Sequence, residues 1–178
     1  GGNSTRMGTD KAFVMLDGRT LLARALEVCR TITSEVRIVG DGKKFAPFAP
    51  VVEDVFPGCG PLAGMHAALR TSRTDLNLVL AVDLPFVSPA LLHFLVAQAR
   101  QNGAIVTVPR AGKGWQPLCA VYRRIFAEAA ETALRAGRYK IDALFEDAVT
   151  HAVGEEELRS AGFSPEVFRN LNTPEELA

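Results

Sequence analysis

The sequence predicts an α/β protein, a three-layer α/β/α sandwich with a mostly parallel sheet and helices on both faces. Helical and strand patterns alternate along the chain, and the run 76–82 is almost continuously apolar, as in strands that are buried on both faces. The chain has 178 residues, of which 48% are hydrophobic and 22% are charged, the size and composition of one globular domain. We therefore treat residues 1–178 as a single domain and expect ligands beyond the carboxyl ends of its strands.

The expected elements follow one another in order along the chain. Thr20 can cap a first helix, because apolar residues recur at helical spacing from Leu22 to Cys29. Ser88 and Pro89 begin a later helix, with a capping residue followed by proline at the first helical position. The expected series is a helix after Thr20, strands at 36–39 and 51–52, a helix over 62–69, a strand over 76–82, a helix after Ser88, strands at 104–108 and 118–122, and a helix over 124–136.

The charge balance and the cysteines exclude several classes of protein. Twenty Lys and Arg residues balance twenty Asp and Glu residues, so the chain lacks the diffuse positive field that holds nucleic acid or an anionic membrane. No apolar run approaches the ~18 residues that span a bilayer. The three cysteines lie far apart and form no CxxC pair. We expect a cytoplasmic protein with reduced thiols, no nucleic-acid partner and no membrane partner.

The opening segment, Gly1–Lys11, suits a polyphosphate ligand. Its glycines let backbone N–H groups approach an anion, while Arg6 offers a planar fork of donors and Lys11 a point charge. The spacing fits neither the Walker A motif nor GxGxxG, and a flexible surface loop is the alternative interpretation. Because a glycine-rich turn of this kind normally follows a strand, we expect a short apolar strand upstream of Gly1.

Two carboxylates are further candidates for a ligand site. Asp83 ends the buried apolar run, where a carboxylate must be paired, cap a turn or bind a cation. With a phosphate loop nearby, Asp83 could hold Mg²⁺, which commonly uses one or two carboxylates and phosphate oxygens. Asp54 begins a Pro- and Gly-rich stretch before a helix, and it could meet a ribose hydroxyl or an amine. The alternatives are a simple cap for Asp83 and an ordinary strand-to-helix connection for Asp54.

The remaining polar residues predict no second site. The three histidines form no order typical of nucleophilic catalysis, and packing is the simpler role for each. The basic pairs around Lys43 and Lys44 and around Arg138 and Lys140 are typical of solvated faces, although a second anionic substrate would need such groups.

Five motifs in one order resemble those of molybdenum cofactor guanylyltransferases, a family within the nucleotidyltransferases. They are residues 1–11, 60–64 (Gly-Pro-Leu-Ala-Gly), 82–86 (Val-Asp-Leu-Pro-Phe), 116–118 (Gln-Pro-Leu) and 170–177, which begins Asn-Leu-Asn-Thr-Pro. The resemblance spans essentially the whole chain. It implies a Rossmann-like nucleotidyltransferase fold that transfers GMP from GTP to molybdopterin cofactor, with molybdoenzymes or their chaperones as further candidate partners.

The resemblance also implies roles for individual residues. Gly1 and Gly2 would bind the nucleotide, Asp54 would contact the nucleoside, and Asp83 would bind both the nucleotide and Mg²⁺. Lys11 and Arg6 would stabilise charge on the phosphates, so that Arg6, Lys11 and Asp83 form the catalytic set. Asn170 and Asn172 would lie in the half of the cleft that receives the pterin.

One position departs from the family pattern. The family often places an Asn that contacts the nucleotide at the end of the second strand, where this sequence has Val39, and Asp41 could substitute for it. Two alternatives therefore stay open. One is a nucleotidyltransferase that uses CTP with molybdopterin or a sugar phosphate, and the other is a noncatalytic nucleotide-binding carrier or chaperone.

Overall fold

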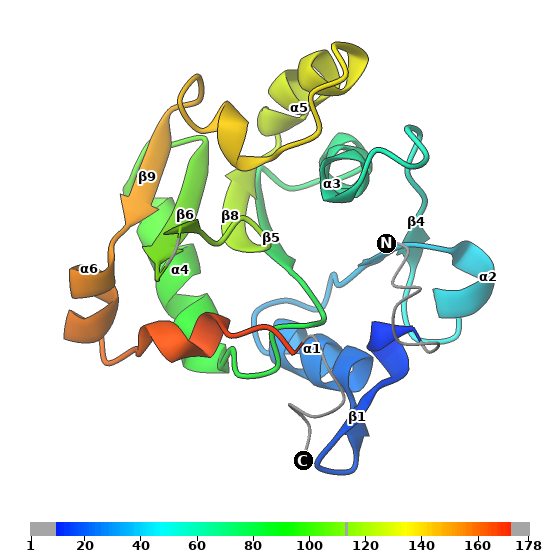
Figure 1. The fold of residues 1–178 in the computed structure, drawn as a ribbon, viewed down its shortest axis with the longest axis horizontal. Helices are drawn as coiled ribbons and strands as arrows, with labels where there is room; N and C mark the ends of the chain where they lie inside the picture. Colours follow the sequence, from blue (N-terminus) through cyan, green and yellow to red (C-terminus); the bar gives the residue numbers. More distant parts are fainter. Residues whose placement is uncertain (1–9, 113, 172–178) are drawn as a thin grey trace.

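The computed structural model describes residues 10–112 and 114–171 of the chain (Figure 1). Within this part of the chain, a five-stranded sheet forms the centre, and two small two-stranded sheets lie nearer the N-terminal end of the sequence. The order in the central sheet is β5-β8-β6-β7, with β9 paired to β6. These strands are β5 (Leu76–Leu80), β6 (Val106–Ala111), β7 (Gly114–Trp115), β8 (Cys119–Arg123) and β9 (Thr150–Val153).

The helices begin where the capping residues of the sequence predict. The Thr20 hydroxyl accepts a hydrogen bond from the amide of Ala23 at 3.1 Å, and the Ser88 hydroxyl accepts one from the amide of Leu91 at 3.3 Å. Both predicted starts are confirmed. The helices are α1 (Leu21–Arg30), α2 (Gly42–Phe45), α3 (Pro61–Arg70), α4 (Pro89–Gln101), α5 (Phe126–Arg135) and α6 (Glu155–Ser160), with short 3-10 turns η2 (Lys11–Phe13), η3 (Asp142–Leu144) and η4 (Pro165–Phe168).

The strands predicted at 36–39 and 51–52 are both present, the first in shorter form and the second with the predicted bounds. They are β3 (Ile38–Val39) and β4 (Val51–Val52), which pair in parallel. Before them, β1 (Met15–Leu16) and β2 (Arg19–Thr20) form an antiparallel hairpin that the sequence analysis did not anticipate. Of the described part of the chain, no helix is both long and apolar enough to cross a membrane.

Strand pairing in the central sheet is mixed rather than mostly parallel, so that part of the prediction is corrected. β8 is antiparallel to both β5 and β6, and β7 is antiparallel to β6, while β6 and β9 are parallel. The reason is the length of the connection between β6 and β8. A parallel crossover needs about a dozen residues or more, and the short segment 112–118 permits only a reversal of direction.

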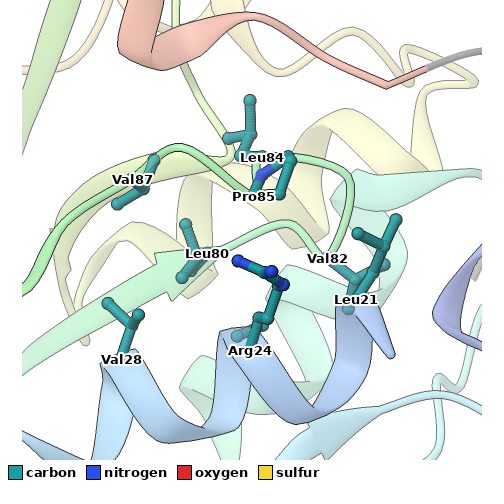
Figure 2. Close-up of a pocket in the computed structure, with 9 residues that line it drawn as sticks. Leu21, Arg24, Val28, Leu80, Val82, Leu84, Pro85 and Val87 are labelled. Atoms are coloured by element: carbon teal, nitrogen blue, oxygen red, sulfur yellow. The ribbon is translucent and has the colours of Figure 1, made fainter. Parts of the chain in front are cut away.

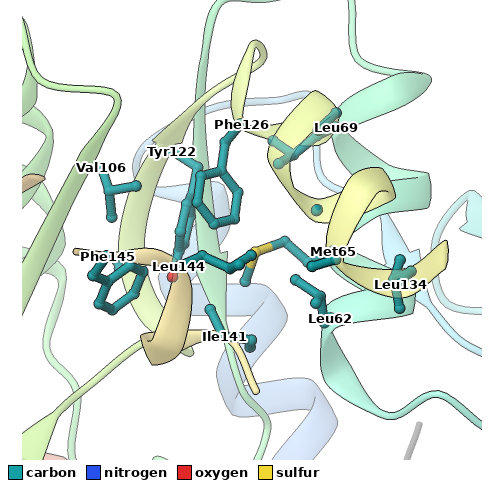
Figure 3. Packing of buried hydrophobic residues seen from close by; sticks show 14 of the residues in the cluster. Leu62, Met65, Leu69, Val106, Tyr122, Phe126, Leu134, Ile141, Leu144 and Phe145 are labelled. Carbon is teal, nitrogen blue, oxygen red and sulfur yellow. The ribbon is translucent and has the colours of Figure 1, made fainter. Parts of the chain in front are cut away.

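Apolar side chains cover both faces of the central sheet. Successive residues of β8 point to opposite faces: Ala120 and Tyr122 pack with α3 and α5, whereas Cys119 and Val121 pack with α4. Figure 3 shows the first of these clusters, in which Tyr122 lies among side chains from α3, α5 and η3. Burial of β8 on both faces explains why its residues 119–122 are continuously apolar, whereas the residues of β5 are half-buried.

The direction of the strands defines one functional edge of the sheet. β5 and β6 are each antiparallel to β8, so β5 and β6 run the same way, and β9 follows β6. The carboxyl ends of β5, β6 and β9 therefore meet at the same edge. The segment that follows β5 reaches Asp83 at this edge, as the sequence predicts.

Candidate nucleotide site

Lys11 and Asp83 lie together although they are far apart in the sequence. The Lys11 ammonium stands 3.5 Å from a carboxylate oxygen of Asp83, and their side chains are only 21% and 24% exposed. A partly buried cation and anion of this kind offer one group for a phosphate and one for a metal ion. The structure therefore brings Lys11, the last residue of the first sequence motif, to Asp83 of the third.

The apolar core beneath this pair explains how the two residues meet. Ala12, which follows Lys11, is buried in a cluster that also contains Ile38 of β3, and Val82, which precedes Asp83, packs against the same cluster. Each charged residue is therefore adjacent in the chain to a side chain anchored in one core. Burial of the neighbours fixes the backbone from which Lys11 and Asp83 project.

The C-terminal end of the described chain contacts the loop that carries Asp83. The amide of Leu171 donates a hydrogen bond to the backbone carbonyl of Asp83 at 3.1 Å, and Leu171 is buried. The guanidinium of Arg169 lies over the ring of Phe86, 4.8 Å from its centre. Asn170 stands exposed between these two contacts. The segment predicted for the pterin half of the cleft therefore docks beside the predicted metal ligand.

The Gln-Pro-Leu motif also contacts the segment that leads to Asp83. The amide of Ala81 donates to the carbonyl of Leu118 at 2.7 Å, which extends the pairing of β5 with β8 past the end of the strand. The Tyr122 hydroxyl donates to the carbonyl of Pro117 at 2.7 Å, and the side-chain Nε2 of Gln116 donates to the carbonyl of Ala111. Residues from four of the five sequence motifs are thus brought to the carboxyl edge of the sheet.

The structure gives less support to the nucleotide contacts expected from Asp54 and Asp41, which lie near β3 and β4. Asp54 is exposed after β4, and the contacts described for this part of the chain do not join it to Lys11 or Asp83. Asp41 caps α2, because its carboxylate accepts a hydrogen bond from the Lys43 amide at 2.8 Å. Because this oxygen of Asp41 already accepts a backbone hydrogen bond, Asp41 is a poorer candidate to replace the nucleotide-contacting Asn that the family often has at the position of Val39.

Val39 has a packing role. A Cβ added at Gly64 of α3 would lie 2.4 Å from a methyl carbon of Val39, closer than real Cβ contacts come. Only glycine fits at this crossing, which accounts for the last glycine of the Gly-Pro-Leu-Ala-Gly motif. Gly60 at the other end of the motif caps α3 with φ of 74°, a conformation that also favours glycine.

A small pocket lies on the α1 side of the loop that carries Asp83 (Figure 2). Its lining is apolar except for Arg24, which rises from α1 toward the loop at Leu84 and Pro85. The Arg24 guanidinium donates to the carbonyl of Leu16 and pairs with Asp17. An apolar pocket with one cation does not suit a polyphosphate, which needs several polar donors.

The donor set fits a magnesium ion that the ligand helps to hold. Among the described residues, no group of three or more His, Cys, Asp and Glu side chains comes together as a metal cluster. Asp83 supplies a carboxylate beside Lys11. Because Mg²⁺ keeps several waters and takes oxygens from substrate phosphates, one carboxylate is sufficient.

His66, Cys29 and Cys119 behave as packing residues. His66 is buried in α3 with its ring against Phe56, and its Nε2 lies 3.5 Å from the carboxylate of Glu131. Burial raises the pKa of the Cys29 thiol to about 11 and that of Cys119 to about 12. Both thiols therefore stay protonated near neutral pH, where they are poor nucleophiles.

Four predicted site residues lie outside the described part of the chain: Gly1, Gly2, Arg6 and Asn172. Two contact residues at the site were missed by the sequence analysis. Asp10 caps η2 by accepting a hydrogen bond from the Ala12 amide at 2.9 Å, and Lys44 of α2 forms an ion pair with Asp10. The capping role of Asp10 could have been predicted from the sequence, because an Asp just before a short turn is a common capping residue. The sequence gives no indication of the ion pair with Lys44.

The fold is α/β, with helices on the faces of a mixed sheet and the paired Lys11 and Asp83 at its carboxyl edge, and the family comparison identifies it as a nucleotidyltransferase. Residues 1–152 match the family described as the MobA-like NTP transferase domain. The chain belongs to this family.

Individual relatives agree with this assignment. A probable molybdenum cofactor guanylyltransferase from Pelotomaculum thermopropionicum is 36% identical over 181 aligned residues, which cover 99% of this chain and 86% of that protein. The crystal structure of molybdopterin-guanine dinucleotide biosynthesis protein A from Archaeoglobus fulgidus is 31% identical, with a TM-score of 0.85 and coverage of 99% of this chain and 91% of that chain. The 2-C-methyl-D-erythritol 4-phosphate cytidylyltransferase from Thermus thermophilus shares the fold, with a TM-score of 0.68 at 22% identity over 94% of this chain and 90% of that chain.

Proposed function

We propose that this chain transfers GMP from GTP to the molybdopterin form of molybdenum cofactor and releases pyrophosphate. The observation that carries the proposal is the Lys11 and Asp83 pair at the carboxyl edge of the sheet, with the C-terminal segment docked beside it. Relatives named as molybdenum cofactor guanylyltransferases align with 99% of the chain, which supports GTP and molybdopterin as the substrates.

The residues of the site have distinct tasks in this reaction. A terminal phosphate of the pterin attacks the α-phosphorus of GTP, so catalysis consists mainly of positioning and charge neutralisation. Lys11 holds the triphosphate, and Asp83 holds Mg²⁺, which neutralises phosphate charge when it is bound. Arg6 is assigned to the same phosphates as a further donor. No protein nucleophile is required, in agreement with the raised pKa values of the Cys29 and Cys119 thiols.

The ion pair between Lys11 and Asp83 also prepares the site for its ligand. Each charge neutralises the other at a partly buried place, where an unpaired charge would be costly. A nucleotide with Mg²⁺ offers each of them a new partner, a phosphate for Lys11 and a cation for Asp83. The ion pair can therefore separate when the ligand binds, and neither charge is left without a partner.

The remaining parts of the proposal concern the wider cleft and the setting of the protein. Gly1, Gly2 and Asp54 are assigned to the nucleotide, and Asn170 and Asn172 to the pterin half. The apolar clusters on the two faces of the central sheet support a three-layer arrangement of the whole domain.

The three free cysteine thiols support a reducing, cytoplasmic location. Molybdoenzymes or their chaperones would receive the product.

The second candidate is the same reaction with CTP. It is favoured by Val39, whose methyl carbon faces Gly64 at a position where the related enzymes often place an amide. A noncatalytic carrier is disfavoured, because such a protein has no need to keep a paired Lys11 and Asp83 at the carboxyl edge.

Nucleotide competition separates these candidates. We expect GTP to bind more tightly than CTP or ATP at fixed Mg²⁺, because a site that pairs with the guanine edge leaves its buried polar groups unsatisfied with another base. Isothermal titration of the three nucleotides measures the preference directly. Tighter binding of CTP would assign the chain to cytidylyl transfer and leave the roles of Lys11 and Asp83 unchanged.

A further inference from the structure

Lys44 stands at one end of a chain of contacts that leads to Lys11. Its ammonium forms an ion pair with the carboxylate of Asp10, and the two side chains are each 36% exposed. Asp10 also accepts the hydrogen bond from the Ala12 amide that caps η2. Lys11 is the first residue of η2, so the cap fixes the turn from which the Lys11 side chain leaves.

The position of Lys44 is itself defined by several contacts. Its ammonium lies 5.4 Å from the centre of the Phe13 ring and 5.5 Å from that of Phe45, and these two rings are stacked. Phe13 is the last residue of η2, and Phe45 is the last residue of α2. Lys44 therefore contacts both ends of η2, through Asp10 at the start and Phe13 at the end.

The helix that carries Lys44 is tied to β4. The amide of Gly42, at the start of α2, donates a hydrogen bond to a carboxylate oxygen of Glu53 at 2.9 Å, and Asp41 caps the same helix. Glu53 immediately follows β4 and precedes Asp54. The short helix α2 thus connects the strand leading to Asp54 with the turn that carries Lys11.

We propose that Lys44 is a positioning residue for nucleotide binding, which holds Asp10 and through it the turn from which Lys11 reaches the triphosphate. This inference rests on the proposed role of Lys11. The pKa of the Asp10 carboxyl is consistent with it: burial opposes ionisation, but the Lys44 ion pair and the Ala12 amide outweigh burial, and the pKa lies below its usual value.

The alternative roles of Lys44 predict different behaviour. If Lys44 only stabilised the fold, its removal would lower the melting temperature and leave the KM for GTP unchanged. If Lys44 itself touched the phosphates, its removal would weaken binding whether or not Lys11 was present. A positioning residue that acts through Lys11 loses its effect once Lys11 has been removed.

The test compares Lys44→Met with the matched variant Lys43→Met in the full chain. Met keeps the apolar stem beside the rings but removes the charge, and Lys43 is an exposed neighbour on α2 that forms no ion pair within the described residues. We expect Lys44→Met to raise the KM for GTP about 10-fold, as outer partners of ligand-binding groups do. Lys43→Met should leave it unchanged. Asp10→Asn, which can still cap η2, should reproduce the effect, and Lys44→Arg should restore most of the binding.

The decisive step repeats Lys44→Met in a Lys11→Met background. No further change in the KM for GTP is expected there. An equal loss in both backgrounds would overturn the inference, as would Lys44→Met behaving like Lys43→Met. If Lys11→Met alone changed neither KM nor kcat, the proposed role of Lys11 would fail together with the inference. If Lys11→Met were impaired while Lys44→Met was not, only the positioning inference would fail.

Discussion

Asp83→Asn is expected to lower kcat by about 10²-fold or more at saturating GTP and Mg²⁺, because it removes the carboxylate assigned to the metal at the attacked phosphate. An amide is a much poorer ligand for Mg²⁺ than a carboxylate. The fold should persist, since Asn has nearly the same shape and the hydrogen bond from Leu171 goes to the backbone carbonyl of residue 83. The measurement is steady-state release of pyrophosphate with the thermal melting temperature recorded alongside.

The matched control for this variant is Asp75→Asn. Asp75 immediately precedes β5 and pairs with Arg123, so it lies at the opposite end of the strand that leads to Asp83. Its removal should leave turnover unchanged. Wild-type turnover in Asp83→Asn would mean that Asp83 only caps the turn before Pro85.

Lys11→Met is expected to lower kcat/KM for GTP by about 10²-fold, because it removes a preorganised charge from the triphosphate. The variant also leaves the Asp83 carboxylate without the ammonium that now stands 3.5 Å away. Binding of Mg²⁺ alone should therefore not weaken, since the competing cation is gone. Titration of Mg²⁺ and of GTP separately distinguishes these two effects.

Lys11→Arg and Lys43→Met complete this series. Arg keeps a positive charge and should recover part of the affinity, although its planar group differs from a point charge. Lys43→Met removes a cation from the nearby helix α2 and should bind GTP normally. If Lys43→Met and Lys11→Met lost equal affinity, the effect would reflect the overall charge rather than contact with the triphosphate.

Local pattern predicts the position of some candidate site residues well, while their roles stay predictions. Asp83 ends an apolar run that predicts a strand, and β5 is that strand, although its residues are only half-buried; its direction brings its carboxyl end to the expected ligand edge. Lys11 was predicted from the composition of its loop, but its contact with Asp83 depends on the shared core around Ala12 and Val82. That contact joins segments 72 residues apart and has no local signal.

The strand directions in the sheet and the contacts of Lys44 could not be predicted from local sequence pattern. Alternation of helices and strands favours parallel pairing, yet β8 enters between β5 and β6 and reverses direction, because the connection 112–118 is too short for a crossover. Lys44 sits in a basic pair that is typical of a solvated face, and only the position of α2 against η2 shows its contact with Asp10. Val39 was noted as a departure, but its packing on Gly64 is visible only where β3 and α3 meet.

The most direct test of guanylyl transfer follows the phosphates of GTP through the reaction. The wild-type chain, molybdopterin cofactor and Mg²⁺ are incubated with GTP labelled either at the α-phosphate or at the γ-phosphate. We predict that the α-label enters the dinucleotide form of the cofactor and that the γ-label leaves as pyrophosphate. Release of the γ-label as inorganic phosphate, or an α-label that never reaches the cofactor, would contradict the account.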